Sequence, residues 1–220
     1  MTPWAPGELD TIIGSLGGKT ITGQWWHQGP NGRPFLFCPD PSRGLGRYHQ
    51  AGGPGAWYAS SSMRASWCEL FRHFMDGPSA IDPFEVRRRA GRVKVTGLTV
   101  LDLCDLDNQV ALRIADDDLV GDDYAICQVL SDAARAAGLD GVLAPSAGLA
   151  GQRTIALFPA AVDGGQVVEQ RSRVQVPPID LVDVLDRVQP TPAGRSGFHA
   201  YVARLRRMGR TVLRQYYRRR

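Results

Sequence analysis

Gly46-Arg47-Tyr48-His49, together with the residues that follow it to Glu69, is the stretch that decides the fold of this chain. A glycine-rich turn at 51–55 separates these four residues from a short predicted strand at 56–59. Three serines at 60–62 then open a predicted helix. This order places Arg47 on a loop, Tyr58 on a strand and Glu69 on a helix, from where the three side chains can converge on one small polar ligand.

The predicted helix carries one apolar stripe at helical spacing. Its members are Met63, Trp67, Leu70, Phe71 and Phe74. Glu69 lies on the opposite side of the helix, and Ala65, one turn earlier, leaves room above its carboxylate. A charge opposite an apolar stripe is ordinary, so the helix by itself favours a solvated surface role for Glu69.

The length and composition indicate a globular protein of one domain with an appendage. The chain has 220 residues, of which 43% are hydrophobic and 22% charged. Four widely spaced cysteines form no CxxC pair, which argues against a zinc site and a disulfide framework and fits a reducing compartment. Since neither a signal peptide nor an apolar run long enough to span a membrane is evident, we expect a cytoplasmic protein without a bound metal.

The basic character of the chain is concentrated at its C-terminus. Residues 195–220 hold nine arginines and no acid, so the net charge of +4 becomes −5 when they are left out. Apolar residues on one face between 197 and 217 predict a basic amphipathic helix. We expect this helix to dock on the body or on a protein partner, and nucleic-acid binding through its arginines and tyrosines is the alternative. The predicted organisation is therefore a domain at 1–164, an extension or linker at 165–194 and the basic helix at 195–220.

Shorter patterns predict the remaining elements. Helices are expected at 8–16 and after Asp122-Asp123, and strands at 20–26, 93–103, 142–144 and 154–158, with a further short strand possible at 34–37. The basic run at 87–89 is interpreted as a solvated face. Asp102, Asp105 and Asp107 are interpreted as turn and cap residues, because they lack the spacing of a calcium loop.

Three common catalytic motifs are absent from the sequence. Gly17-Gly18-Lys19-Thr20 resembles the end of a phosphate-binding P-loop, but Ile13 stands where the first glycine is needed. Ser146 lies just past a predicted strand without the Gly-x-Ser-x-Gly elbow of serine hydrolases. No dinucleotide-binding fingerprint of the Rossmann type is present either.

Read in order, the motifs resemble the RES domain family, which is named for its arginine, glutamate and serine. The resemblance covers roughly residues 20–162 and rests on Gly46-Arg47-Tyr48, Trp57-Tyr58-Ala59-Ser60, Ala65, Glu69, Ala144-Pro145-Ser146 and Leu157-Phe158-Pro159. It implies an α+β fold with a small mixed or antiparallel β-sheet core and flanking helices, similar to ADP-ribosyltransferase-like toxins. It also implies an NAD⁺-consuming enzyme, often a toxin paired with an antitoxin of the Xre type.

The resemblance implies a role for each matching residue. Glu69, Arg47 and Ser146 would be catalytic, and Arg47, Tyr48, Tyr58, His27 and Ser146 would bind substrate. Cleavage of the nicotinamide–ribose bond builds positive charge on the ribose, which a carboxylate such as Glu69 stabilises. Arg47 would hold the pyrophosphate, Tyr58 would bracket the nicotinamide and Ser146 would donate a hydrogen bond. NAD⁺ would be the substrate, and no further cofactor is expected.

One departure from the family pattern bears on activity. Many members place a Tyr-Arg pair on the first strand, where this chain has Trp26-His27. His27 matches the charge of an arginine only when it is protonated. The acceptor of the ADP-ribosyl group also stays open, since water gives a glycohydrolase, phosphate a phosphorylase and a protein an ADP-ribosyltransferase. A non-catalytic binding module of the same fold is a further alternative.

Overall fold

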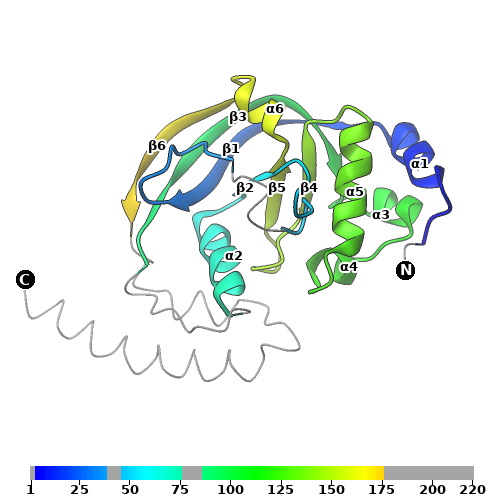
Figure 1. Ribbon diagram of the computed structural model, residues 1–220, viewed down its shortest axis with the longest axis horizontal. Coiled ribbons are helices and arrows are strands. Elements are labelled where there is room, and N and C mark those ends of the chain that lie inside the picture. Colours follow the sequence, from blue (N-terminus) through cyan, green and yellow to red (C-terminus); the bar gives the residue numbers. More distant parts are fainter. Residues whose placement is uncertain (1–2, 39–45, 76–85, 176–220) are drawn as a thin grey trace, which may run out of the picture.

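The computed structural model describes residues 3–38, 46–75 and 86–175 (Figure 1). The predicted basic helix at 195–220, and the part of the predicted linker after residue 175, lie outside these ranges. The described elements, in chain order, are α1 (Glu8–Leu16), β1 (Lys19–Pro30), β2 (Trp57–Ser60), α2 (Met63–Met75), β3 (Arg88–Asp102), α3 (Leu106–Leu112), α4 (Asp116–Val120), α5 (Ala125–Ala136), β4 (Gly141–Pro145), β5 (Arg153–Leu157), α6 (Pro159–Asp163) and β6 (Val167–Gln175).

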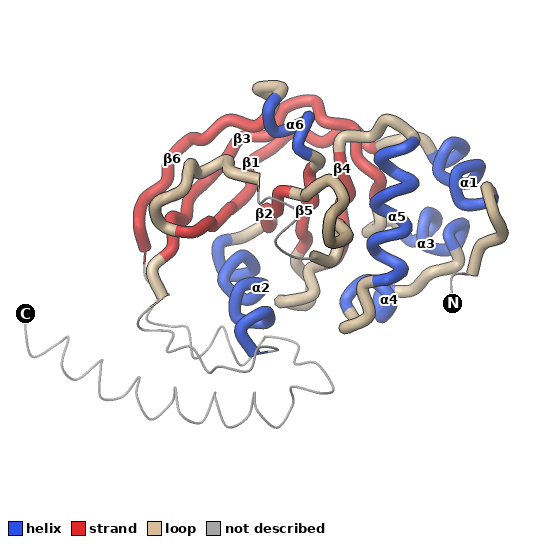
Figure 2. The backbone as a smooth tube through the Cα atoms, viewed as in Figure 1, coloured by secondary structure: helices blue, strands red, loops and turns tan. Residues whose placement is uncertain are grey.

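The strands form one mixed sheet with the order β1-β2-β5-β4-β3-β6. Only β3 and β4 run parallel among the described strands, and the other pairings are antiparallel. β1 pairs with β3 along nearly its whole length and with β2 through the single pair Trp26↔Ser60, so the sheet curls back on itself. Helix α2 lies inside this curve, and the other large helices gather at one end (Figure 2). The α+β fold expected from the sequence is confirmed.

Two hydrophobic clusters stabilise the two faces of the sheet. One cluster joins α1, α3, α4 and α5 to Ala144, Ala156 and Tyr58, and includes the buried Leu130 of α5. The other lies on the face that carries Trp57, where α6 packs. Because side chains alternate along a strand, neighbouring residues of β2 serve different faces: Trp57 belongs to one cluster and Tyr58 to the other.

Helix α2 differs from the one-sided amphipathic helix predicted from the sequence. The hydroxyl of Ser62 accepts a hydrogen bond from the amide of Ala65 at 3.1 Å and so caps the first turn, as expected. Ala65, however, is fully buried, as are Trp67 and Cys68. The helix is surrounded on several sides because the sheet curves around it. Glu69 is therefore half-buried rather than a solvated surface residue.

Several other predictions can be compared with the structure. Helix α1, strand β1 and helix α5 lie where they were expected, and Asp105 caps α3 through bonds from the amides of Asp107 and Asn108. The short strand expected at 34–37 is wrong, since this segment forms turns. The interpretation of the basic run at 87–89 as a solvated face is confirmed for Arg87, which is exposed, and wrong for Arg88 and Arg89, which are half-buried. The segment expected to be a linker contributes β6, which pairs with β3.

Within residues 3–38, 46–75 and 86–175, no helix is long and apolar enough to cross a membrane. The same ranges contain no group of three or more His, Cys, Asp or Glu side chains that is arranged to hold a metal ion. The four cysteines are free thiols.

Candidate active site

A cavity of about 360 Å³ opens where β1, β2 and α2 meet. Its volume falls within the range of about 300–1,000 Å³ that is usual for small-molecule sites. Its wall is formed by the end of β1 and the loop after it, the turn at 46–49, β2, α2, the first residue of β3, and β4 and β5 with the loop between them. Residues that line it include His27, Gln28, Arg47, Tyr48, His49, Tyr58, Glu69, Arg72, Arg88 and Thr154.

The carboxylate of Glu69 is held in this wall through one of its two oxygens. Its Oε1 accepts hydrogen bonds from the Ser146 hydroxyl at 2.6 Å, the Gly148 amide at 3.1 Å and the Thr154 hydroxyl at 3.2 Å. Its Oε2 has no hydrogen-bond partner among the residues that the structure describes. The side chain is thus fixed in orientation and still has a full acceptor for a ligand.

The loop that supplies two of these donors is itself closely fixed. Ser146 Oγ also accepts from the amide of Leu149 at 3.1 Å, which closes a tight turn. A Cβ on Gly148 would lie 2.5 Å from the backbone nitrogen of Glu69, so glycine permits the close approach of the loop to α2. Sequence reasoning placed Ser146 against the substrate, whereas the structure places its hydroxyl against Glu69.

Arg72 ties this loop to the far side of the cavity. Its guanidinium donates to the carbonyl of Ala147 at 2.7 Å and to the carbonyl of Val120 at 2.7 Å, and pairs with Asp122 at 3.1 Å. The side chain is 5% exposed. Buried guanidinium bonds to backbone carbonyls fix two loops relative to α2, so Arg72 positions the segment that contacts Glu69.

The Tyr58 hydroxyl closes the opposite wall. It accepts a hydrogen bond from the Tyr48 amide at 3.1 Å and lies 3.0 Å from Nδ1 of His49. Burial raises the pKa of Tyr58 and lowers the pKa of His49, so the tyrosine stays protonated and can donate to a neutral imidazole. A Cβ on Gly46 would lie 2.3 Å from the His49 ring, which explains the glycine in this turn.

The ring of Tyr48 lies mainly in the hydrophobic core, whereas Arg47 faces the cavity. The ring of Tyr48, predicted to bind substrate, is 2% exposed and belongs to the hydrophobic cluster under α5. Arg47 lines the cavity, with Nη1 donating to the carbonyls of Leu119 at 2.9 Å and Gly121 at 2.7 Å. Its guanidinium carbon lies 4.5 Å from the centroid of the Tyr124 ring. Arg47 therefore holds the end of α4 as well as facing the cavity.

His27 lines the cavity with a ring that contacts within the protein hold in place. Its Nδ1 lies 2.6 Å from the carbonyl of Tyr58, and its ring stacks on Trp57 at 4.3 Å between centroids. Burial lowers the pKa of His27 to about 4, so the ring carries no charge at neutral pH. The cationic role that protonation would have given it is not available under these conditions.

The motif-based site did not include Gln28, Arg72, Arg88 and Thr154, which line the cavity, or Gly148, whose amide donates to Glu69. Thr154 and Gly148 lie 85 and 79 residues from Glu69 in the chain, so no local pattern connects them with it. Arg72 follows Glu69 by three positions on α2, a spacing that puts both side chains on neighbouring faces. That spacing is the one sequence signal that could have included Arg72.

Comparison with known protein families agrees with this geometry. The family model described as the RES domain matches residues 19–183, which contain every residue of the cavity wall named above. This chain belongs to the RES domain family. The match also includes β6, which extends the family region beyond the limit of residue 164 expected for the domain.

Individual relatives give the same assignment. The chain is 43% identical over 208 residues to "Probable NAD(+) phosphorylase Rv3189" of Mycobacterium tuberculosis, covering 94% of this chain and 98% of the relative. It is 33% identical over 94 residues to "NAD(+) phosphorylase MbcT" of Mycobacterium bovis, covering 42% of this chain and 50% of that protein. The crystal structure of the M. tuberculosis MbcT–MbcA toxin–antitoxin complex superposes with a TM-score of 0.68 at 26% identity, covering 77% of this chain and 92% of the matched chain.

Proposed function

We propose that this RES domain protein cleaves the nicotinamide–ribose bond of NAD⁺ and transfers the ADP-ribosyl group to inorganic phosphate. The observation that carries the proposal is the Glu69 carboxylate of the cavity wall, whose Oε1 is bonded to three donors and whose Oε2 has no hydrogen-bond partner among the described residues. Relatives that are named NAD(+) phosphorylases support the choice of phosphate as the acceptor.

Glu69 would act on the charge that develops as nicotinamide leaves. The bond between C1′ of the ribose and the ring nitrogen breaks, its electrons go to the nicotinamide, and C1′ gains oxocarbenium character. A carboxylate oxygen near the ribose stabilises that charge, most strongly where water is excluded. A phosphate oxygen then bonds to C1′, which gives nicotinamide and ADP-ribose 1″-phosphate as the products.

The donors around Glu69 prepare this carboxylate for the reaction. Thr154 comes from β5, and Ser146 and the Gly148 amide come from the loop between β4 and β5, so the carboxylate is oriented before the substrate binds. Such preorganisation removes the cost of reorientation in the transition state. Ser146 thus contributes to catalysis by positioning Glu69.

Arg47 would bind a phosphate group of NAD⁺, and Tyr58 would contact its nicotinamide ring. Arg47 lines the cavity with a planar guanidinium that suits a phosphate group. The Tyr58 ring forms part of the opposite wall and would flank the nicotinamide, while its hydroxyl holds the turn at 46–49. The reaction needs no redox cofactor, because nicotinamide leaves without a change of oxidation state.

Release of nicotinamide from NAD⁺, measured with and without inorganic phosphate, tests the proposal. We expect rapid release that depends on phosphate, with phosphate incorporated into the ADP-ribosyl product. Release of equal rate without phosphate would instead identify a glycohydrolase. No release under either condition would contradict the proposal and favour a binding module of the same fold.

We further propose that the enzyme acts as a toxin held inactive by an antitoxin. The structural neighbour comes from a toxin–antitoxin complex, which supports a protein partner of this kind. Expression in a bacterial host is expected to lower cellular NAD⁺ and stop growth, and Arg47→Ala is expected to relieve both effects. Growth arrest with unchanged NAD⁺ would point to another target, such as a modified protein.

A further inference from the structure

Arg88 occupies a position in the cavity wall to which the sequence motifs assign no role. It is the first residue of β3 and pairs with Pro30, while Ala90 pairs with Gln28. Because side chains alternate along a strand, Arg88 and Gln28 share one face of the sheet. The Arg88 Nε donates to the Gln28 Oε1 at 2.7 Å, and both residues line the cavity.

The two terminal nitrogens of Arg88 have no partner among the residues that the structure describes. The neighbouring Arg89 contrasts with it, because alternation puts Arg89 on the other face, where it pairs with Glu169 at 3.0 Å. Arg72 pairs with Asp122, and Arg47 donates to carbonyls of the chain. Burial lowers the pKa of Arg88, so the protein bears a desolvation cost at this residue without a counter-charge in the described ranges.

A purely structural role does not account for this arrangement. β1 and β3 are already joined by a continuous backbone ladder from Lys19↔Val100 to Pro30↔Arg88. One side-chain bond at its end adds little, and an apolar residue would avoid the cost of burying a charge. Gln28 instead holds Arg88 through Nε, and the two terminal nitrogens, Nη1 and Nη2, remain for a ligand.

We infer that Arg88, oriented by Gln28, forms a phosphate-binding subsite at the β1–β3 side of the Glu69 cavity. Two parallel N–H groups match two oxygens of a phosphate group. The identity of the ligand rests on the proposed function, which offers two sources of this group: the diphosphate of NAD⁺ and the inorganic phosphate acceptor.

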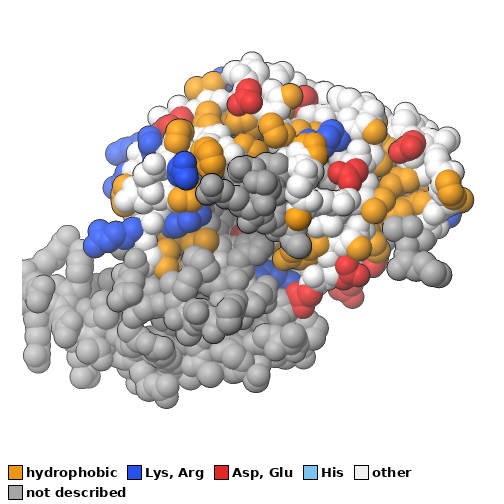
Figure 3. Space-filling model, viewed as in Figure 1, with side chains coloured by type: hydrophobic (Ala, Val, Ile, Leu, Met, Phe, Trp, Pro, Cys, Tyr) orange, Lys and Arg blue, Asp and Glu red, His pale blue; other side chains and the backbone are white. Residues whose placement is uncertain are grey.

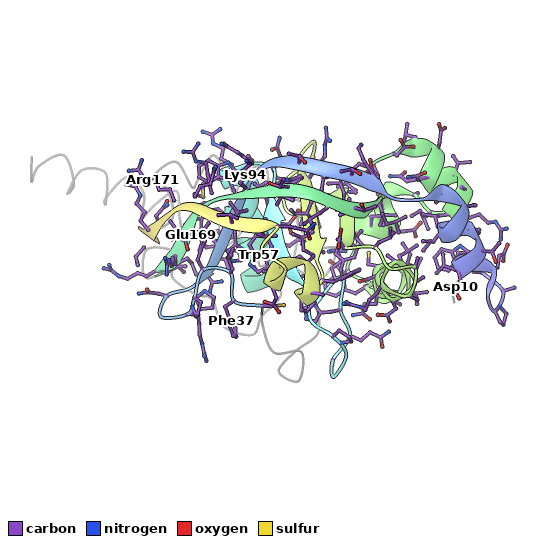
Figure 4. All side chains as sticks on the ribbon, turned by 90° about the horizontal axis from the view of Figure 1, so that it is seen from above. Asp10, Phe37, Trp57, Lys94, Glu169 and Arg171 are labelled. Carbon is purple, nitrogen blue, oxygen red and sulfur yellow. The ribbon has the colours of Figure 1, made fainter. Side chains whose placement is uncertain are left out.

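The surroundings of Arg88 favour an anion on this side. The same face of the sheet carries Arg92, Arg171 and Arg173, because Arg92 pairs with Arg171 and Ala90 with Arg173. In Figure 4, the side chains of Arg171 and Lys94 project on the same side of the sheet. Figure 3 shows Lys and Arg side chains gathered toward β6 and acidic side chains toward α4. A positive field of this kind attracts phosphate groups toward the subsite.

Calorimetric titration of the full chain with two probes, inorganic phosphate and ADP-ribose, tests this subsite. Arg88→Ala is expected to weaken the binding of one probe by about tenfold to a hundredfold, the effect of losing charge-assisted hydrogen bonds. Arg88→Lys is expected to retain part of the affinity, because it keeps the charge but loses the fork. A loss of affinity for inorganic phosphate identifies Arg88 as part of the acceptor site. A loss of affinity for ADP-ribose identifies it as part of the site for the diphosphate.

Arg87→Ala is the matched control, since Arg87 is exposed and carries the same charge one position earlier. Its affinities are expected to stay within about twofold of those of the unaltered protein. Gln28→Leu tests the positioning role: it is expected to weaken the same probe as Arg88→Ala and to add nothing in the double variant. If Arg88→Ala fails to fold, the titrations of Gln28→Leu and Arg88→Lys replace it as the test of the subsite.

The inference is overturned if Arg88→Ala binds both probes as the unaltered protein does, if Arg87→Ala loses as much affinity, or if the unaltered protein binds neither probe. Nicotinamide release is measured separately in the same preparations. Its absence, with binding still dependent on Arg88, would contradict the proposed function and leave the subsite intact. Normal release with binding independent of Arg88 would contradict the subsite alone.

Discussion

The two walls of the cavity use their hydrogen bonds in opposite ways. On one wall, three donors converge on a single oxygen of Glu69, and the second oxygen keeps its acceptor capacity. On the other wall, the Tyr58 hydroxyl contacts the Tyr48 amide and the His49 ring, so its polar capacity is used within the protein. Residues of one motif thus divide into those that present a group to the ligand and those that build the wall.

This division separates residues that looked equivalent in the sequence. Ser146 belongs with Glu69, because its hydroxyl lies 2.6 Å from the carboxylate. Tyr48 and His27 belong with the wall, the first in the core under α5 and the second stacked on Trp57. Substitutions on the Glu69 wall should therefore reduce catalysis, and those on the Tyr58 wall should reduce stability first.

The largest effect is expected for Glu69→Gln. The amide keeps the shape but loses the charge that stabilises the oxocarbenium, so the rate of nicotinamide release should fall by at least about a hundredfold. The control is Glu169→Gln, which removes a carboxylate that pairs with Arg89 away from the cavity. Full turnover by Glu69→Gln, measured by nicotinamide release, would mean that another group stabilises the charge.

Gly148→Ala is expected to have the next largest effect. The added Cβ would lie 2.5 Å from the Glu69 nitrogen, so the loop must move away from α2 and the bond from the Gly148 amide must lengthen. We expect a loss of about tenfold or more in turnover, as for other small displacements of positioning groups. Gly14→Ala is the control, since a Cβ there meets no atom within 4 Å and alanine favours the helix. Equal activity of both variants would show that the loop tolerates displacement.

Ser146→Ala and Thr154→Val compare the two hydroxyl groups that donate to Glu69. The Ser146 bond is the shorter, at 2.6 Å against 3.2 Å, and Ser146 also holds the Leu149 amide. Ser146→Ala should therefore lower the turnover number by about tenfold and Thr154→Val by a few-fold, the scale of single hydrogen bonds to a charged group. A larger loss in Thr154→Val, measured under saturating NAD⁺, would reverse their order of importance.

Tyr58→Phe should act mainly on stability. It keeps the ring in the wall but removes the hydroxyl that holds the turn at 46–49, leaving the Tyr48 amide without its partner. We expect the free energy of unfolding to fall by about 1–3 kcal/mol, with turnover changed less than in Ser146→Ala. Denaturant unfolding beside the nicotinamide assay measures both quantities. A collapse of turnover at unchanged stability would place the hydroxyl on the substrate instead.

The smallest effect on activity at neutral pH is expected for His27→Phe, which keeps an aromatic ring against Trp57. His27 has a pKa of about 4 in the folded protein against 6.5 as its ordinary value. The unfolded state therefore binds the extra proton between these values, and stability falls as the pH drops from 6.5 to 4, by about 3 kcal/mol in total. His27→Phe should lose this part of the pH dependence, as measured by unfolding at several pH values. An unchanged pH profile would mean that His27 is already charged or exposed.

The sequence predicted the local features of this site because they depend on local patterns. The order of turn, strand and helix around Glu69 follows from glycine positions, strand-forming residues and the serine cap, and each lies where it was expected. Helix α5 was likewise predicted from its apolar face and its end at Gly138, which has a φ of 76°. These are short-range properties of the chain.

The pairing of distant residues could not be predicted from the same patterns. The partners of Glu69 come from β5 and the loop that precedes it, and the roles of His27 and Arg88 follow from the register of β1 with β3. Register depends on the assembled sheet, and a shift by one residue would exchange the faces of His27 and Gln28. The strand β6 was missed because its exposed, basic sequence has no clear apolar alternation, and pairing with β3 stabilises it.

The role of Glu69 in NAD⁺ cleavage is tested by the products that the purified full chain forms from NAD⁺ and inorganic phosphate. Phosphorus NMR and mass spectrometry of the reaction distinguish ADP-ribose 1″-phosphate from ADP-ribose. We predict nicotinamide and ADP-ribose 1″-phosphate in equal amounts from the unaltered protein, and at most about a hundredth of these amounts from Glu69→Gln in the same time. Intact NAD⁺ after prolonged incubation of the folded, unaltered protein would contradict NAD⁺ cleavage by this chain, and the same products at the same rate from Glu69→Gln would contradict the role of the Glu69 carboxylate in it.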